Sequence, residues 1–213
     1  MKRSVVIIIA AIVCVIAVAA LYLFSPIGTG RDSLNDKQVE SLCSYFGESW
    51  FENASDEASP DFWNDLDTTR QTAVRIIGTE DKGELKAVYG YYYALEYLNH
   101  KGKAYEIDGE GGPFVVDVNI DGDNVRVAGD RYDGTMPLTT DDMPLRYLLQ
   151  TRAYEACGAS RLQKTVDNKA EEALGVPVDR NYRFDMTDTT YTIYDGQNSD
   201  EIIEEGKTED LVR

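Results

Sequence analysis

The chain has 213 residues, enough for one domain of ordinary size with appendages but too few for two large domains. It contains 38 acidic and 21 basic residues, for a formal net charge of −17. This charge argues against a protein that binds nucleic acid or an anionic lipid surface, because both need basic patches.

The first predicted element is a membrane segment. Lys2 and Arg3 precede an uncharged apolar run over residues 5–24. As a helix this run spans about 30 Å, the thickness of a bilayer core. Residues 1–24 are therefore a membrane anchor or a signal segment. Ala17-Val18-Ala19 fits the small-x-small pattern of signal cleavage, so cleavage stays open, although the run is longer than a usual signal core.

The two basic residues before this run are expected to keep the N-terminus in the cytoplasm. The predicted location is the cell membrane, with a single pass and an extracytoplasmic C-terminal domain. Residues 25–35, SPIGTGRDSLN, lack periodicity and are typical of a linker. The expected partners are the membrane, through the N-terminal helix, and a cell-wall component or membrane protein. Nucleic acid is not an expected partner.

Two cysteines, Cys43 and Cys157, lie in the part predicted to be outside the cell, where disulfides can form. The sequence does not show whether their Cα atoms lie within about 7 Å, so a bridge between them stays open. Two distant cysteines and one histidine do not make a structural zinc site. We expect no cofactor.

Residues 36–195 are predicted to form an extracytoplasmic α+β domain. Its first helix, with Asn35 or Asp36 as the cap, is indicated by apolar residues at three- and four-residue spacing: Val39, Leu42, Cys43, Phe46, Trp50 and Phe51. Segments rich in β-branched and aromatic residues follow at 70–79, 85–98, 103–108 and 114–120, and the alternation resumes at Val125 and Val127. Turn residues separate them, and GEGGP, residues 109–113, is expected to break the third from the fourth. The segments predict an antiparallel meander over residues 70–130.

A helical region is predicted next. Pro144 opens it, and Leu145, Leu148 and Leu149 form one apolar edge. A second helix, marked by apolar residues from Leu162 to Leu174, ends at the Gly175-Val176-Pro177 break. Residues 178–195 can add one or two strands, and the charged tail 196–213 is expected to be disordered. The result is an antiparallel sheet packed against helices, one layer on one layer, cystatin-like or NTF2-like by analogy.

The stretch VDVNIDGDNVRV, residues 116–127, has the two-residue spacing of a calcium loop, with Asp117, Asn119 and Asp121 followed by Gly122. A loop of the EF-hand type needs a bidentate carboxylate at its twelfth position, which here is Ala128. The stretch therefore predicts a hairpin with an Asp-Gly-Asp-Asn turn. Weak cation binding with help from Asp130 or Asp133 stays open.

Residues 76–127 show a strand, a tyrosine-rich strand, a Gly-Gly-Pro break, a hydrophobic strand and an Asp-Gly turn, and Met143-Pro144 opens a helix. This pattern resembles a poorly characterised extracytoplasmic domain of Gram-positive membrane-anchored proteins, also found beside membrane metallopeptidases of the β-lactam-sensor type. The resemblance covers about a hundred residues, and Thr135-Met136-Pro137 stands where the family usually has Tyr-Tyr. It implies an anchored, outward-facing module and transfers no functional residues. The chain lacks the His-Glu-x-x-His motif of metallopeptidases.

The candidate ligand-binding residues lie on one side of the tyrosine-rich strand: Tyr89, Tyr91, Tyr93 and Tyr97. An exposed aromatic row can stack on sugars or peptides. If a helix covers the same face, these residues are core instead, and the sequence leaves both interpretations open.

The expected function is a non-catalytic binding or accessory module at the cell surface. The alternative is a carboxylate-dependent hydrolase acting on cell-envelope material. A hydrolase would need carboxyl groups with raised pKa in a cleft. His100 lies in a predicted turn, Asn-His-Lys-Gly, and is expected to be a solvated surface residue. The sequence identifies no catalytic residue.

Overall fold

The computed structural model describes residues 34–54, 65–128 and 143–212, with side chains for all of these except 49–54. The predicted membrane segment, residues 1–24, lies outside the described residues. Among the helices within the described ranges, none combines the length and the apolar character needed to cross a membrane.

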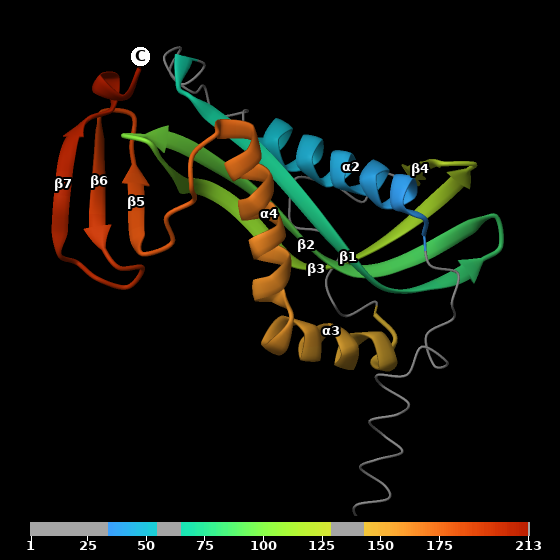
Figure 1. Ribbon diagram of the computed structural model, residues 1–213. Coiled ribbons are helices and arrows are strands. Elements are labelled where there is room, and N and C mark those ends of the chain that lie inside the picture. Colours follow the sequence, from blue (N-terminus) through green and yellow to red (C-terminus); the bar gives the residue numbers. More distant parts are fainter. Residues whose placement is uncertain (1–33, 55–64, 129–142, 213) are drawn as a thin grey trace, which may run out of the picture.

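A four-stranded antiparallel sheet forms the centre of the molecule, in the order β1-β2-β3-β4 (Figure 1). Its strands are β1 (Thr68–Lys82), β2 (Leu85–His100), β3 (Lys103–Asp121) and β4 (Asn124–Val127). The meander predicted over residues 70–130 is confirmed, but the break predicted at residues 109–113 is wrong, because these residues pair with β2 inside a continuous β3.

The acidic stretch at the end of β3 forms the predicted hairpin. Asp121 pairs with Asn124 across a two-residue turn, and Gly122 has φ +61°, a left-handed conformation that costs glycine nothing. Two of the acidic side chains are engaged by lysines. Asp117 pairs with Lys82 at 3.1 Å, and the turn residue Asp123 pairs with Lys37 of the first helix at 2.6 Å.

Helix α2 (Asp36–Ala54) covers one face of this sheet. Asn35 caps it reciprocally with Gln38: each side-chain oxygen accepts the backbone N–H of the other residue, at 3.0 and 2.9 Å. Phe46 is fully buried, and its ring stacks on Tyr92 with 4.6 Å between centroids. The predicted helix and its cap are confirmed. The side chains of Trp50 and Phe51 lie outside the described residues.

Helices α3 (Leu145–Cys157) and α4 (Ala159–Leu174) cover the opposite face, the side that carries the odd-numbered tyrosines of β2. Leu162, Val166 and Ala170 of α4 are buried there, and α4 ends, as predicted, at Gly175 in the left-handed conformation. The sheet therefore has helices on both faces, which corrects the expected one layer on one layer. The reason is that both faces of β2 are apolar and both need cover.

A second, three-stranded antiparallel sheet packs against the end of the first (Figure 1). It consists of β5 (Tyr182–Met186), β6 (Thr190–Asp195) and β7 (Ile202–Lys207), and the short helix η3 (Thr208–Leu211) follows. Phe184, Tyr191 and Ile193 bury themselves against Leu98 and Tyr105 of the long hairpin β2–β3.

The expectation of a disordered tail from residue 196 is wrong for residues 202–211. β7 pairs with β6 along its length, and Thr208 and Leu211 are buried. Backbone pairing with β6 and the burial of Leu211 in the shared core offset the charged composition of this segment. The domain therefore extends beyond residue 195.

Candidate functional site

The tyrosine row of β2 is part of the core. Tyr89, Tyr91 and Tyr97 are at most 5% exposed, and Tyr93 is half-buried. The Tyr89 ring stacks on Tyr147 of α3 with 4.3 Å between centroids. The interpretation of Tyr89, Tyr91 and Tyr97 as an exposed binding face is therefore wrong, because α3 and α4 cover them.

The hydroxyl groups of Tyr89 and Tyr97 have carboxylate partners. Tyr89 donates a hydrogen bond to Glu80 at 3.0 Å, and Tyr97 donates one to Asp167 of α4 at 2.6 Å. Burial, reinforced by these carboxylates, raises the pKa of both phenols. Both remain neutral donors: Tyr89 links β2 to β1, and Tyr97 ties α4 to the sheet.

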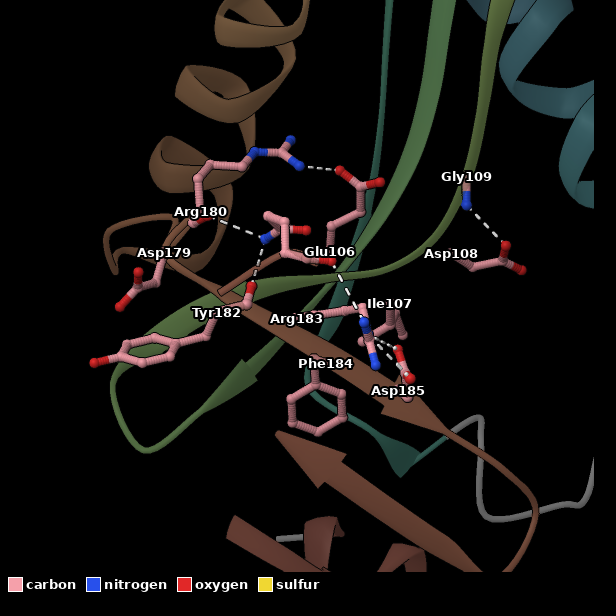
Figure 2. A pocket seen from close by; sticks show the side chains of 11 residues that line it. Glu106, Ile107, Asp108, Gly109, Asp179, Arg180, Tyr182, Arg183, Phe184 and Asp185 are labelled. Carbon is pink, nitrogen blue, oxygen red and sulfur yellow. Dashed lines mark hydrogen bonds and ion pairs between the residues drawn. The ribbon is translucent and has the colours of Figure 1, made fainter. Parts of the chain in front are cut away.

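A groove of about 320 Å³ lies where the second sheet meets the edge of β3 (Figure 2). Residues 106–109 of β3 line one side, residues 179–185 in and before β5 line the other, and Gln197 comes from the turn between β6 and β7. β4 pairs with β3 only at residues 118–121, and Ala104 is bridged to Val178. Residues 106–109 of β3, which lie between these two contacts, line the groove.

Arg180 lies on one wall of the groove, and its guanidinium is held in place by three side chains. It hydrogen-bonds Glu106 and Asp167, and it donates to the Tyr97 hydroxyl at 3.1 Å. Burial alone would lower the pKa of Arg180, but the bonds with Asp167 and Glu106 outweigh it and raise the pKa. Arg180 is therefore a fixed cation whose position is set by β2, β3 and α4 together.

Arg183 is fixed in a similar way on β5. Its Nε lies 3.2 Å from both carboxylate oxygens of Asp185, and its guanidinium lies 4.0 Å from the centroid of the Tyr194 ring. The Gln197 amide donates to the carbonyl oxygens of Arg180 and Tyr182, at 3.0 and 2.6 Å. The wall is thus braced by side chains from β5, β6 and the turn after β6.

Two acidic residues add hydrogen-bond acceptors to the groove. Asp179 accepts from Lys103 at 2.6 Å and from the Asn181 N–H at 3.0 Å. Burial alone would raise the pKa of Asp179, but these two bonds outweigh it and lower the pKa. Asp108 is exposed and accepts the N–H of Gly109 at 2.7 Å. The groove therefore offers fixed guanidinium donors and carboxylate acceptors around Ile107 and Phe184.

His100 is not the solvated surface residue that the sequence predicts. Its side chain is 12% exposed, and Nε2 lies 2.8 Å from Oε1 of Glu204 on β7. The same oxygen accepts from the Tyr191 hydroxyl and pairs with Lys101, each at 2.8 Å. Burial alone would raise the pKa of Glu204, but these three partners lower it to about 2. No signal in the sequence joins residues 100 and 204.

Glu204 makes the stability of the protein depend on pH in the acidic range. Its pKa in the folded state, about 2, lies below the ordinary value of 4.5. The ionised carboxylate therefore stabilises the fold above pH 4.5, and this contribution is lost as the pH falls toward 2. We expect the loss to be on the order of 1–2 kcal/mol after screening by solvent.

The measurement is chemical denaturation of the full chain between pH 6 and pH 2, compared with Glu204→Gln. The variant should show a smaller loss of stability over this range, and Glu205→Gln, on the same strand but exposed, should behave like the unchanged chain. Equal pH dependence in Glu204→Gln and the unchanged chain would contradict the role of Glu204.

The cysteines form no disulfide, and the described residues contain no group suited to bind a metal ion. Both cysteines are free: Cys43 is half-buried on α2, where burial raises the pKa of its thiol, and Cys157 is exposed at the end of α3. Within residues 34–48, 65–128 and 143–212, no three His, Cys, Asp or Glu side chains are grouped so that they could hold a metal ion.

Comparison of the chain with protein-family models, with curated proteins and with solved structures finds no match. The resemblance to the extracytoplasmic domain of Gram-positive membrane-anchored proteins therefore stays a prediction. The groove and the chemistry of its lining are the features of the structure that bear on function.

Proposed function

We propose that the chain is a non-catalytic binding module, held at the outer surface of a cell membrane by residues 1–24, that uses the groove between its two sheets to bind a polar ligand. The observation that carries this proposal is the groove itself, with guanidinium groups and carboxylates fixed before any ligand arrives. Such prearranged polar groups reduce the cost of ordering the site on binding.

The chemistry of the lining favours a ligand that both donates and accepts hydrogen bonds. Arg180 and Arg183 offer donors, Asp108 and Asp185 offer acceptors, and Ile107 and Phe184 add apolar surface. Glycans and short peptides have this mixture of groups, and both occur in cell envelopes. A volume of about 320 Å³ is at the lower end for small-ligand sites. It suits one or two sugar rings, or a few residues of peptide.

The carboxylates at the groove support binding in preference to the hydrolase alternative. A general acid needs a raised pKa, so that it still carries its proton near neutral pH. The hydrogen bonds to Asp179 lower its pKa, and Glu106 is occupied by Arg180. By analogy, a long curved sheet with helices packed on it, as in cystatin-like or NTF2-like folds, is a frame that accommodates binding sites at its open ends.

The test is calorimetric titration of the full chain in detergent with three probes: chitooligosaccharides, a muropeptide and a cationic peptide. One class should bind saturably, and Arg183→Gln should weaken that binding by about 1.5–3 kcal/mol, as expected for loss of a charged hydrogen-bond donor. Arg126→Gln, on exposed β4 and outside the groove, is the matched control and should bind normally. Absence of binding by all three probes, or equal weakening in both variants, would contradict the proposal.

The membrane position has its own test. The full chain expressed in a Gram-positive host should stay with the membrane after alkaline carbonate extraction, and protease added to intact cells should digest its C-terminal domain. Release by carbonate would contradict the anchor, and protection from protease would contradict the outward orientation.

A further inference from the structure

The charged side chains of the groove do not balance. Five carboxylates and three cations line the groove or bond directly to residues that line it: Glu106, Asp108, Asp167, Asp179 and Asp185, with Lys103, Arg180 and Arg183. Every cation of this set is paired within it. Arg180 bonds two of the carboxylates, Lys103 and Arg183 bond one each, and one carboxylate is left over. The set therefore carries a formal surplus of two negative charges.

Asp108 is the carboxylate without a cation. It is exposed on β3, and within the part of the chain that the structure describes it forms no ion pair (Figure 2). Its Oδ1 accepts the N–H of Gly109 at 2.7 Å, a bond that orients the carboxylate, and no described residue donates to its Oδ2. A neutral N–H donor does not cancel the charge of a carboxylate. Asp108 therefore offers an oriented acceptor for a positively charged group.

The Arg183 guanidinium has spare N–H groups but no spare charge. Its Nε bonds Asp185, its Nη1 lies 3.4 Å from the carbonyl oxygen of Gln197, and no described residue accepts from its Nη2. The ring of Tyr194 supports the face of the guanidinium. A second carboxylate here would add to the negative surplus, so the spare N–H groups suit a neutral acceptor such as an amide carbonyl.

Ile107 supplies apolar surface to the same groove. It precedes Asp108 in the chain, is half-buried and lines the groove. Lysine-type side chains lay their methylene groups on apolar surface while the ammonium group reaches a polar partner. An amino sugar also carries an ammonium group, but that group sits directly on a ring edged with hydroxyl groups. It therefore lacks the flexible apolar stem that Ile107 would contact.

We propose that the groove binds a cationic peptide, in which a lysine-type ammonium group pairs with Asp108 and amide carbonyls accept hydrogen bonds from Arg183. The inference rests on the proposed use of the groove as a binding site, and it adds the charge and the class of the ligand. The volume of about 320 Å³ accommodates one long side chain and the peptide units beside it. The net charge of −17 favours the approach of a cation over that of an anion at low ionic strength.

The test is calorimetric titration of the full chain in detergent with three tripeptides whose ends are blocked. The tripeptides differ in the central residue, which is lysine, acetylated lysine or glutamate. The lysine peptide should bind about three- to fivefold more tightly than the acetylated one, as for a strong exposed ion pair, and the glutamate peptide should bind least tightly. The advantage of lysine should shrink at about 0.5 M salt, because salt screens the pair.

Three variants locate the ammonium group. Asp108→Asn keeps an acceptor for the Gly109 N–H but removes the charge, so it should bind the lysine and acetylated peptides equally. Asp121→Asn, exposed at the other end of β3 and outside the groove, is the matched control and should keep the preference for lysine. Arg183→Gln should weaken binding of both peptides by the same factor, because both present the same carbonyl groups.

The outcomes separate this inference from the proposed function. If a glycan or a muropeptide binds through Arg183 while the lysine peptide has no advantage over the acetylated one, the cationic ligand is overturned and the groove stands as a binding site. If glucosamine oligomers bind more tightly than the lysine peptide and lose this binding in Asp108→Asn, a peptide is overturned as the occupant. If the preference for lysine survives Asp108→Asn, or is lost equally in Asp121→Asn, the inference is overturned. If no peptide and no glycan binds, both proposals are overturned.

Discussion

Replacing Phe46 by alanine is expected to destabilise the protein by about 3–5 kcal/mol, the range for truncating a fully buried aromatic side chain. Phe46 is the residue through which α2 enters the core: its ring stacks on Tyr92 at 4.6 Å and lies 4.7 Å from Phe114. Alanine would remove both ring contacts and leave a cavity that the long strands cannot close.

The measurement is urea denaturation of the full chain, followed by circular dichroism. Ser44→Ala, exposed on the same helix, is the control and should change the free energy of unfolding by less than about 0.5 kcal/mol. A loss below about 1 kcal/mol in Phe46→Ala would contradict the docking of α2 on this face of the sheet.

Gly78 and Tyr147 are expected to be strongly coupled. A Cβ atom at Gly78 would lie 2.1 Å from Cε1 of Tyr147, whose ring stacks on Tyr89 and whose hydroxyl donates to the Thr79 carbonyl oxygen at 3.1 Å. Gly78→Ala should therefore cost about 1–3 kcal/mol through overpacking. Tyr147→Ala should cost about 3–5 kcal/mol because the ring is fully buried.

A double-mutant cycle tests this coupling. In the Tyr147→Ala background, Gly78→Ala should be neutral or slightly stabilising, because the clash is gone and alanine reduces the freedom of the unfolded chain. Gly112→Ala is the matched control, since a Cβ there would meet no atom within 4 Å, and it should be nearly neutral. Additive effects of Gly78→Ala and Tyr147→Ala would show that α3 does not pack over Gly78 as described.

Local patterns account for most of the elements. The spacing of Val39, Leu42 and Phe46 predicts α2, and Asn35 with Gln38 forms its cap. The Asp121–Asn124 turn predicts its hairpin, because glycine takes a left-handed conformation that few other residues adopt. These features depend on residues within a few positions of one another, so a single sequence contains them.

The candidate site could not be predicted in the same way. Glu106 meets Arg180, and His100 meets Glu204, across separations of 74 and 104 residues. Each of these residues, taken alone, is an ordinary polar residue of an acidic chain. The tyrosine row was a more visible signal, but tyrosine is amphipathic and suits either a binding face or a core with hydrogen-bonded hydroxyls.

By itself, then, the sequence determined the α+β class, the meander, the end of α4 and a marked apolar segment at the N-terminus, since periodicity and turn chemistry act over short distances. The tertiary structure decided which helix covers which face of β2, that residues 202–207 join a second sheet, and that Leu145 and Leu149 of α3 are exposed while Leu148 packs against the core. Both faces of β2 are apolar, so each face must be buried against another element. The local sequence of β2 does not specify which helix covers which face. Long-range packing decides which helix covers which face. Long-range packing also brings the second sheet against β3, and the groove forms where the two sheets meet.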